Sequence, residues 1–200
     1  MTNDKQAILV ILSRILDYPD QLFFEEQSLI VSFIQEYIST EDSQKEVVKR
    51  ISPLYELSLK ELQELYVETF DYKDNTNLYL TAHELGDSRK RGVALIELQK
   101  QIHEAGYECV TKELADYIPM LLELLAVVPE EEKISNLSAR LAYAMDRILT
   151  NLPNSNPYKK VMELGMIYVF ETPELEKISR LEILREEADL NELPYPLMYR

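Results

Sequence analysis

The feature that most constrains the fold is the spacing of the apolar residues, which recur every three or four positions along most of the chain. In the first such segment they share one face of a helix: Ile8, Ile11, Leu12, Ile15 and Leu16. Alternating apolar and polar residues, which indicate strands, form no convincing run, and the sequence has no Asn-Gly or Asp-Gly hairpin turn. We therefore predict an all-α fold.

Prolines and capping residues mark the ends of the first predicted helices. Pro19 disfavours helical geometry at the residue before it and so ends the first helix. Asp20 can cap a second helix, which its apolar residues extend to Tyr37. Ser58 and Glu61 have the spacing of a capping box, in which each side chain binds a backbone N–H near the start of a helix.

A short helix over residues 78–85 is predicted to end at Gly86, because glycine readily adopts the backbone conformation with positive φ that stops helices. Asp87 or Ser88 can cap the helix that follows. Gly92 lies in the first turns of that helix, where glycine costs up to about 1 kcal/mol relative to alanine. We expect the close approach of a neighbouring helix to justify this glycine.

An almost wholly apolar helix is predicted to extend to about Val128, which suggests a central position in the fold. Asp116 can cap it, and Pro119 fits its first turn because the missing N–H has no intrahelical partner there. The remaining predicted helices cover residues 44–57, 133–152 and 158–170.

We predict a single-domain helical bundle, residues 1–170, followed by a flexible acidic segment, residues 171–200. From Glu171 onward the chain has eight acidic and four basic residues, with one helical piece near residues 173–190. The last eight residues are proline-rich and too short to join a bundle. The chain of 200 residues is long enough to bury a core without disulfides or a structural metal.

The net charge of −15 argues against a surface for nucleic acid or anionic membranes, because phosphate contacts need clustered Lys and Arg. It is compatible with a basic partner. The single cysteine, Cys109, excludes an internal disulfide and fits a reducing compartment. The N-terminus lacks the features of a signal peptide, and no apolar run reaches the roughly 18–20 residues of a membrane span. We expect a cytoplasmic protein without membrane insertion.

Sequence motifs for catalysis are absent. The segment from Gly86 to Gly92 lacks the spacing and the Lys-Ser/Thr of a P-loop, and no GxGxxG motif occurs. No glutamate stands three residues before His83 or His103, which excludes the Glu-x-x-His pairs of di-iron bundles. We expect neither catalytic residues nor a metal site. A metal- or nucleotide-dependent helical-bundle enzyme, suggested by His83, Asp87 and the nearby arginines, is the alternative.

Charged residues crowd the start of the helix after residue 86, where Asp87, Arg89, Lys90 and Arg91 occupy four of five positions. A solvated first turn is the simplest interpretation. Cations at a helix N-terminus oppose the helix dipole, however, so tertiary partners or a ligand would explain them. Asp87 or Glu84 could pair with Arg89 or Arg91, and a buried pair would clamp two helices together.

Three segments resemble the NarJ-type nitrate reductase assembly chaperones, part of a wider helical family of molybdoenzyme maturation chaperones. The most specific runs from Tyr66 to Leu95 and contains YVETFD and LYLTAHELGDSRKRGVAL. LSRILDYPD, from Leu12, is similar to the opening helix and turn of the family, and ELADYIP, from Glu113, is similar to a later element. Ala115 departs from the family, which usually has proline there. The resemblance covers roughly residues 8–170.

The resemblance implies a non-enzymatic chaperone that binds the N-terminal segment of the catalytic (alpha) subunit of a respiratory nitrate reductase. It would keep that subunit competent for insertion of the molybdenum guanine dinucleotide cofactor and then release it for membrane docking. The cofactor enters the client, so we expect the chaperone to bind none tightly. The client segment is helix-prone and basic, which an acidic surface would suit. We expect a monomer or weak homodimer.

Carried over residue by residue, the resemblance places peptide contacts in each of two segments. The first is the most specific one, with its aromatic helix and its histidine, and the second is ELADYIP, with its adjacent aspartate and tyrosine. The predicted peptide-binding residues are Tyr66, Phe70, His83, Asp116 and Tyr117. Five further residues of the segment LYLTAHELGDSRKRGVAL could belong either to the peptide site or to a structural clamp between helices, and the sequence leaves both roles open. They are Gly86, Asp87, Arg89, Arg91 and Gly92.

Overall fold

The computed structural model describes residues 2–109, 113–128 and 136–171. Within these ranges there is no β-strand, only an isolated antiparallel bridge between Tyr79 and Tyr117. The all-α prediction is therefore confirmed. In chain order the described elements are α1 (Asn3–Ile15), α2 (Gln21–Glu25), α3 (Gln27–Tyr37), α4 (Glu41–Tyr55), α5 (Leu59–Tyr66), the π-helical η1 (Val67–Asp71), α6 (Leu80–Leu85), α7 (Lys90–Glu104), α8 (Ile118–Val127), α9 (Leu137–Asn151) and α10 (Pro157–Tyr168).

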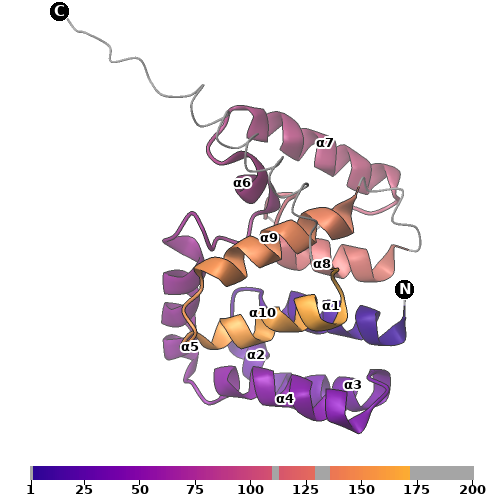
Figure 1. The fold of residues 1–200 in the computed structure, drawn as a ribbon, viewed down its shortest axis with the longest axis vertical. Helices are drawn as coiled ribbons and strands as arrows, with labels where there is room; N and C mark the ends of the chain where they lie inside the picture. Colours follow the sequence, from indigo (N-terminus) through magenta and orange to yellow (C-terminus); the bar gives the residue numbers. More distant parts are fainter. Residues whose placement is uncertain (1, 110–112, 129–135, 172–200) are drawn as a thin grey trace, which may run out of the picture.

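The helices stack along the long axis of the molecule, with α3 and α4 at one end and α6 and α7 at the other (Figure 1). Between them lies α1, which packs against α8, α10 and α3. Because neighbours cover α1 on several sides, apolar residues around most of its circumference are buried: Ala7, Ile8, Leu9, Ile11, Leu12 and Ile15.

The close approach of helices expected at Gly92 occurs instead at Gly165 in α10. A Cβ atom at Gly165 would lie 3.2 Å from Met145 Cε and 3.3 Å from Leu12 Cδ1 and Phe170 Cε2. At Gly92 the same atom would have no neighbour within 4 Å among the residues that the structure describes. The prediction for Gly92 is wrong, because this glycine faces open space.

The caps predicted at Asp20, Ser58 and Glu61 are confirmed. Asp20 accepts a backbone N–H in the first turn of α2 at 3.2 Å, and both hydrogen bonds of the Ser58–Glu61 capping box are present. The single helix expected after Asp20 is wrong, because the chain turns at Glu26 between α2 and α3. Glu26 accepts a hydrogen bond from Arg14 of α1 at 2.7 Å, which holds this turn against α1.

The three helices predicted after residue 112 and before residue 171 correspond to α8, α9 and α10. The predicted start of α9 at residues 133–135 and the acidic segment from residue 172 lie outside the described residues. Among the helices that the structure describes, none is long and apolar enough to cross a membrane.

Candidate functional site

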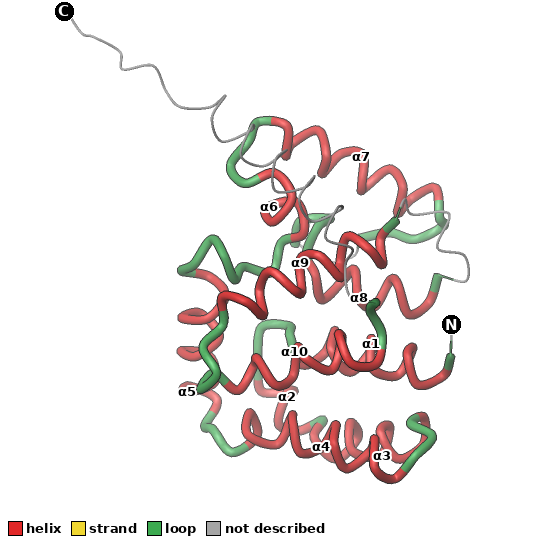
Figure 2. Tube along the Cα trace, viewed as in Figure 1, coloured by secondary structure: helices red, strands yellow, loops and turns green. Residues whose placement is uncertain are grey.

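The connection before α6 and the connection before α8 meet in the middle of the molecule, although about 35 residues separate them in the chain (Figure 2). Leu80 N donates to Asp116 O at 2.9 Å, and Ile118 N donates to Leu78 O at 2.8 Å. This antiparallel pairing fixes Asp116 and Tyr117 against the start of α6. We call this region the junction.

Asp116 caps α6 from the other connection. Its carboxylate, which is fully buried, accepts hydrogen bonds through Oδ2 from the backbone N of Thr81 at 3.1 Å and from the Thr81 hydroxyl. Asp116 Oδ1 has no hydrogen-bond partner in the described part of the chain. The prediction that Asp116 caps α8 is wrong: α8 has no side-chain cap, because this carboxylate satisfies an N–H of α6 instead.

Arg91 joins α7 to the junction. Its Nε donates to Thr81 Oγ1 at 3.1 Å, and its Nη2 lies 3.6 Å from Asp116 Oδ2. The guanidinium carbon lies 5.8 Å from the centroid of the Tyr79 ring, within the range of a cation–π interaction. Arg91 therefore contacts α6 and both connections of the junction.

Glu84 forms a second link, from α6 to α9. Arg140 donates to it through two parallel hydrogen bonds, Nε to Oε1 at 2.7 Å and Nη2 to Oε2 at 2.8 Å. This bidentate geometry gives the strongest common ion pairs in proteins. Glu84 was one of the two acidic residues expected to pair with Arg89 or Arg91, and the structure pairs it with Arg140 of α9 instead.

The turn between α6 and α7 contains the remaining residues of the charged string. Gly86 ends α6 with a φ of 58°, as predicted. The N-cap of α7 is Arg89, and no side chain caps this helix, so the prediction that Asp87 or Ser88 caps it is wrong. Ser88 Oγ nevertheless accepts from the backbone N of Lys90 at 3.2 Å. Asp87 and Arg89 are exposed.

A hydroxyl network connects the junction to α1 and α5. Tyr117 OH donates to Asp17 Oδ1 at 3.0 Å, and the hydroxyls of Tyr66 and Tyr117 lie 2.9 Å apart. Burial raises the pKa of Tyr66 and of Tyr117 far above the ordinary tyrosine value. Both hydroxyls therefore stay protonated. Because Tyr117 uses its only hydroxyl proton on Asp17, the Tyr66 hydroxyl, which also lies 3.4 Å from Leu16 O, donates across the shorter contact.

Aromatic rings pack beside this network. Tyr66 contacts Phe70 edge-to-face with ring centroids 5.0 Å apart, and Tyr18 in the same way at 5.3 Å. Phe70, in the π-helical turn η1, contacts Tyr158 of α10 at 4.9 Å. Tyr66, Phe70 and Tyr117 thus form one nearly buried cluster, with exposed fractions of 4%, 2% and 7%.

His83 of α6 faces the loop before the junction and is fully buried. Its Nε2 lies 2.7 Å from Asn77 O, and its Nδ1 has no partner within residues 2–109, 113–128 and 136–171. Burial lowers the pKa of His83 to about 4, and the nearby Arg147 and Arg91 add to this effect. The ring is therefore neutral at physiological pH, and Nε2–H donates to the loop.

The predicted site residues thus occupy adjacent parts of one region but form no reactive set. In the ranges that the structure describes, no group of three or more His, Cys, Asp or Glu side chains could hold a metal ion. Two important residues, Asp17 and Thr81, were not predicted. Both belong to the strings LDYPD and LYLTAH that carried the family resemblance, which was the available signal.

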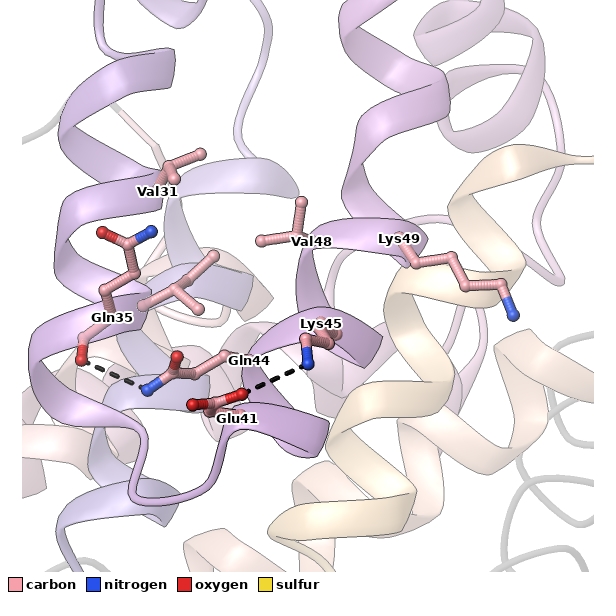
Figure 3. Close-up of a pocket in the computed structure, with 8 residues that line it drawn as sticks. Val31, Gln35, Glu41, Gln44, Lys45, Val48 and Lys49 are labelled. Carbon is pink, nitrogen blue, oxygen red and sulfur yellow. Dashed lines mark hydrogen bonds and ion pairs between the residues drawn. The ribbon is translucent and has the colours of Figure 1, made fainter.

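A separate groove lies between α3 and α4, at the end of the molecule opposite α6 and α7 (Figures 1 and 3). Gln44 Nε2 donates to Gln35 O at 3.2 Å, and Lys45 Nζ pairs with Glu41 at 3.3 Å. No predicted site residue lines this groove, whose described lining is Val31, Ile34, Gln35, Glu41, Gln44, Lys45, Val48 and Lys49.

Comparison with known proteins gives consistent matches. The family model described as "Nitrate reductase delta subunit" matches residues 34–152. The "Probable nitrate reductase molybdenum cofactor assembly chaperone NarJ" of Bacillus subtilis is 33% identical over 130 residues, 65% of this chain and 70% of that protein.

Two proteins of Escherichia coli K12 also match. Its "Nitrate reductase molybdenum cofactor assembly chaperone NarJ" is 33% identical over 137 residues, 64% of this chain and 55% of that protein. Its "Probable nitrate reductase molybdenum cofactor assembly chaperone NarW" is 28% identical over 125 residues, 62% of this chain and 52% of that protein. The chain therefore spans about half the length of these two relatives.

Proposed function

Because the chain belongs to the nitrate reductase delta subunit family, as the sequence resemblance predicted, we propose that it is a chaperone for the maturation of a nitrate reductase. Its relatives in Bacillus subtilis and Escherichia coli are named as molybdenum cofactor assembly chaperones of that enzyme, not as enzymes. Family membership is the observation that carries the proposal.

The client in this proposal is the catalytic subunit of the reductase, bound through its N-terminal segment. The chaperone keeps the subunit competent for insertion of the molybdenum guanine dinucleotide cofactor, which passes into the client. A net charge of −15 supports binding of a basic, helix-prone segment. A cytoplasmic location follows from this client, because the resemblance places the catalytic subunit there.

The five predicted peptide-binding residues act mainly by supporting the site, because each of them is buried. Tyr66, Phe70 and Tyr117 form its base. Asp116 fixes the start of α6, and His83 holds the loop before it. Substitution of any of them weakens binding by loosening the surface above.

Calorimetry with a synthetic peptide of the client's N-terminal segment tests the proposal, with a scrambled peptide of the same composition as control. We expect saturable binding that weakens when salt rises from about 0.1 M to about 1 M, because exposed charge pairs are screened over that range. The Asp116→Ala variant should bind more weakly. Absence of binding by the wild-type chain at high micromolar peptide concentration would contradict the proposal.

A further inference from the structure

An exposed aromatic ring lies directly after the buried ring cluster. Tyr72 is 81% exposed, although Phe70, two residues earlier in η1, is 2% exposed. Exposed apolar side chains are common on protein surfaces, so exposure by itself does not indicate function. The loop that carries Tyr72, residues 72–77, gives further information.

Hydrogen bonds within the chain segment close this loop on itself. Tyr72 N donates to Val67 O at 3.3 Å, the long-range bond of a π-helical turn, and such turns are frequent at functional sites. Thr76 N donates to Lys73 O at 3.1 Å, and the buried Thr76 hydroxyl donates to Thr69 O. The loop is therefore fastened to the end of η1.

Side chains from other parts of the fold hold the loop from outside. His83 of α6 bonds Asn77 O at 2.7 Å, and Arg147 of α9 donates to Asn75 Oδ1 at 3.3 Å. Asn156, at the start of α10, donates to Thr69 Oγ1 at 2.8 Å. Three separate elements thus fix one short surface loop and the turn beneath it.

Holding the loop has a cost. Fixing the loop's backbone is unfavourable in conformational entropy, and the buried His83 ring that bonds the loop has no partner for Nδ1 among the described residues. A loop held in place before binding loses little further backbone freedom on contact, which raises affinity. Tyrosine is also among the residues that contribute most to protein interfaces.

We propose that Tyr72 is a pre-organised contact residue for the client's N-terminal segment, an inference that rests on the proposed function. Its ring face suits an apolar or a cationic side chain. Asp71 and Asp74 outnumber Lys73 beside it in the chain, which complements a basic segment. Among the aromatic residues from Tyr66 to Tyr79, Tyr72 alone is largely exposed.

Calorimetry with the client peptide, comparing the wild-type chain with Tyr72→Ala, tests this inference. We expect the Kd to rise at least about tenfold, as for an interface hot spot, with the thermal midpoint unchanged because the side chain is exposed. Tyr72→Phe, which keeps the ring, should bind within about twofold of wild type. The matched control is Tyr37→Ala, which removes a 44% exposed tyrosine from α3 at the other end of the molecule and should leave the Kd unchanged.

A second variant separates the ring from its support. Thr76→Ala keeps Tyr72 but removes the buried hydroxyl that closes the loop, and should raise the Kd about threefold to tenfold while speeding amide exchange in residues 71–77. Binding by the wild type with an unchanged Kd for Tyr72→Ala would overturn this inference and leave the proposed function standing. No binding by the wild type would overturn both.

Discussion

Replacing Asp116 with alanine tests how strongly the junction holds the fold. The substitution removes the acceptor of the Thr81 N–H and hydroxyl and the carboxylate that faces Arg91. An unsatisfied buried donor costs about 1–3 kcal/mol, and breaking a buried ion pair costs about 3–5 kcal/mol. The Arg91 side chain is 25% exposed and can reach water, which favours the lower end of the second range. We expect the free energy of unfolding to fall by about 3 kcal/mol.

Urea unfolding followed by far-UV circular dichroism measures this loss. The control is Asp20→Ala, which removes one hydrogen bond at an exposed helix cap and should cost about 1 kcal/mol. Asp116→Asn keeps an acceptor oxygen for Thr81 N but loses the charge, so its loss should fall between the two. An Asp116→Ala variant no less stable than Asp20→Ala would refute the reasoning.

Three further predictions concern stability, all measurable by urea unfolding. The pKa of His83 is lowered to about 4 in the fold and is near 6.5 in the unfolded chain. As the pH falls, His83 is therefore protonated in the unfolded state before it is in the folded state, and the free energy of unfolding decreases. From pH 7.5 to about pH 5 the wild type should therefore lose about 2 kcal/mol relative to His83→Gln, and parallel pH profiles would contradict this. Gly165→Ala should destabilise by about 1–3 kcal/mol through overpacking, whereas Gly92→Ala should stabilise by about 0.5–1 kcal/mol; equal effects would count against the packing argument. Arg140→Lys should cost about 1–2 kcal/mol, because lysine cannot form two parallel bonds to Glu84, and no loss would show that the bidentate geometry is unimportant.

The helices and several of their ends could be predicted because the signals are local. The apolar stripe of α1 and the caps at Asp20 and Ser58 depend on residues within one or two turns of each other. Such contacts form in the same way whatever the rest of the chain does. The sequence therefore contains enough information to place them.

Side chains with two possible partners could not be assigned from sequence. Asp116 stands before a helix and could cap it, but the pairing of two distant connections brings Thr81 closer. Similarly, Gly92 and Gly165 both lie inside helices, and only the packing of α10 shows which of them needs a missing side chain. These outcomes depend on distances between residues far apart in the chain, which the sequence pattern does not show.

The sequence did not show that the predicted peptide-binding residues are buried. Tyr66, Phe70 and Tyr117 lie together, yet they are buried beneath the surface rather than forming it. The presence of aromatic and acidic residues in a segment does not show whether their side chains face solvent or the core. The exposed Tyr72 became distinct from its neighbours only when burial was known.

Capture of the client tests the central claim most directly. A tagged form of this chain is produced in cells together with the nitrate reductase catalytic subunit, either intact or lacking its N-terminal segment, and the co-purified subunit is quantified. The proposed function predicts that the intact subunit is captured and that the truncated subunit is not. Equal capture of both forms, or of neither, would contradict it.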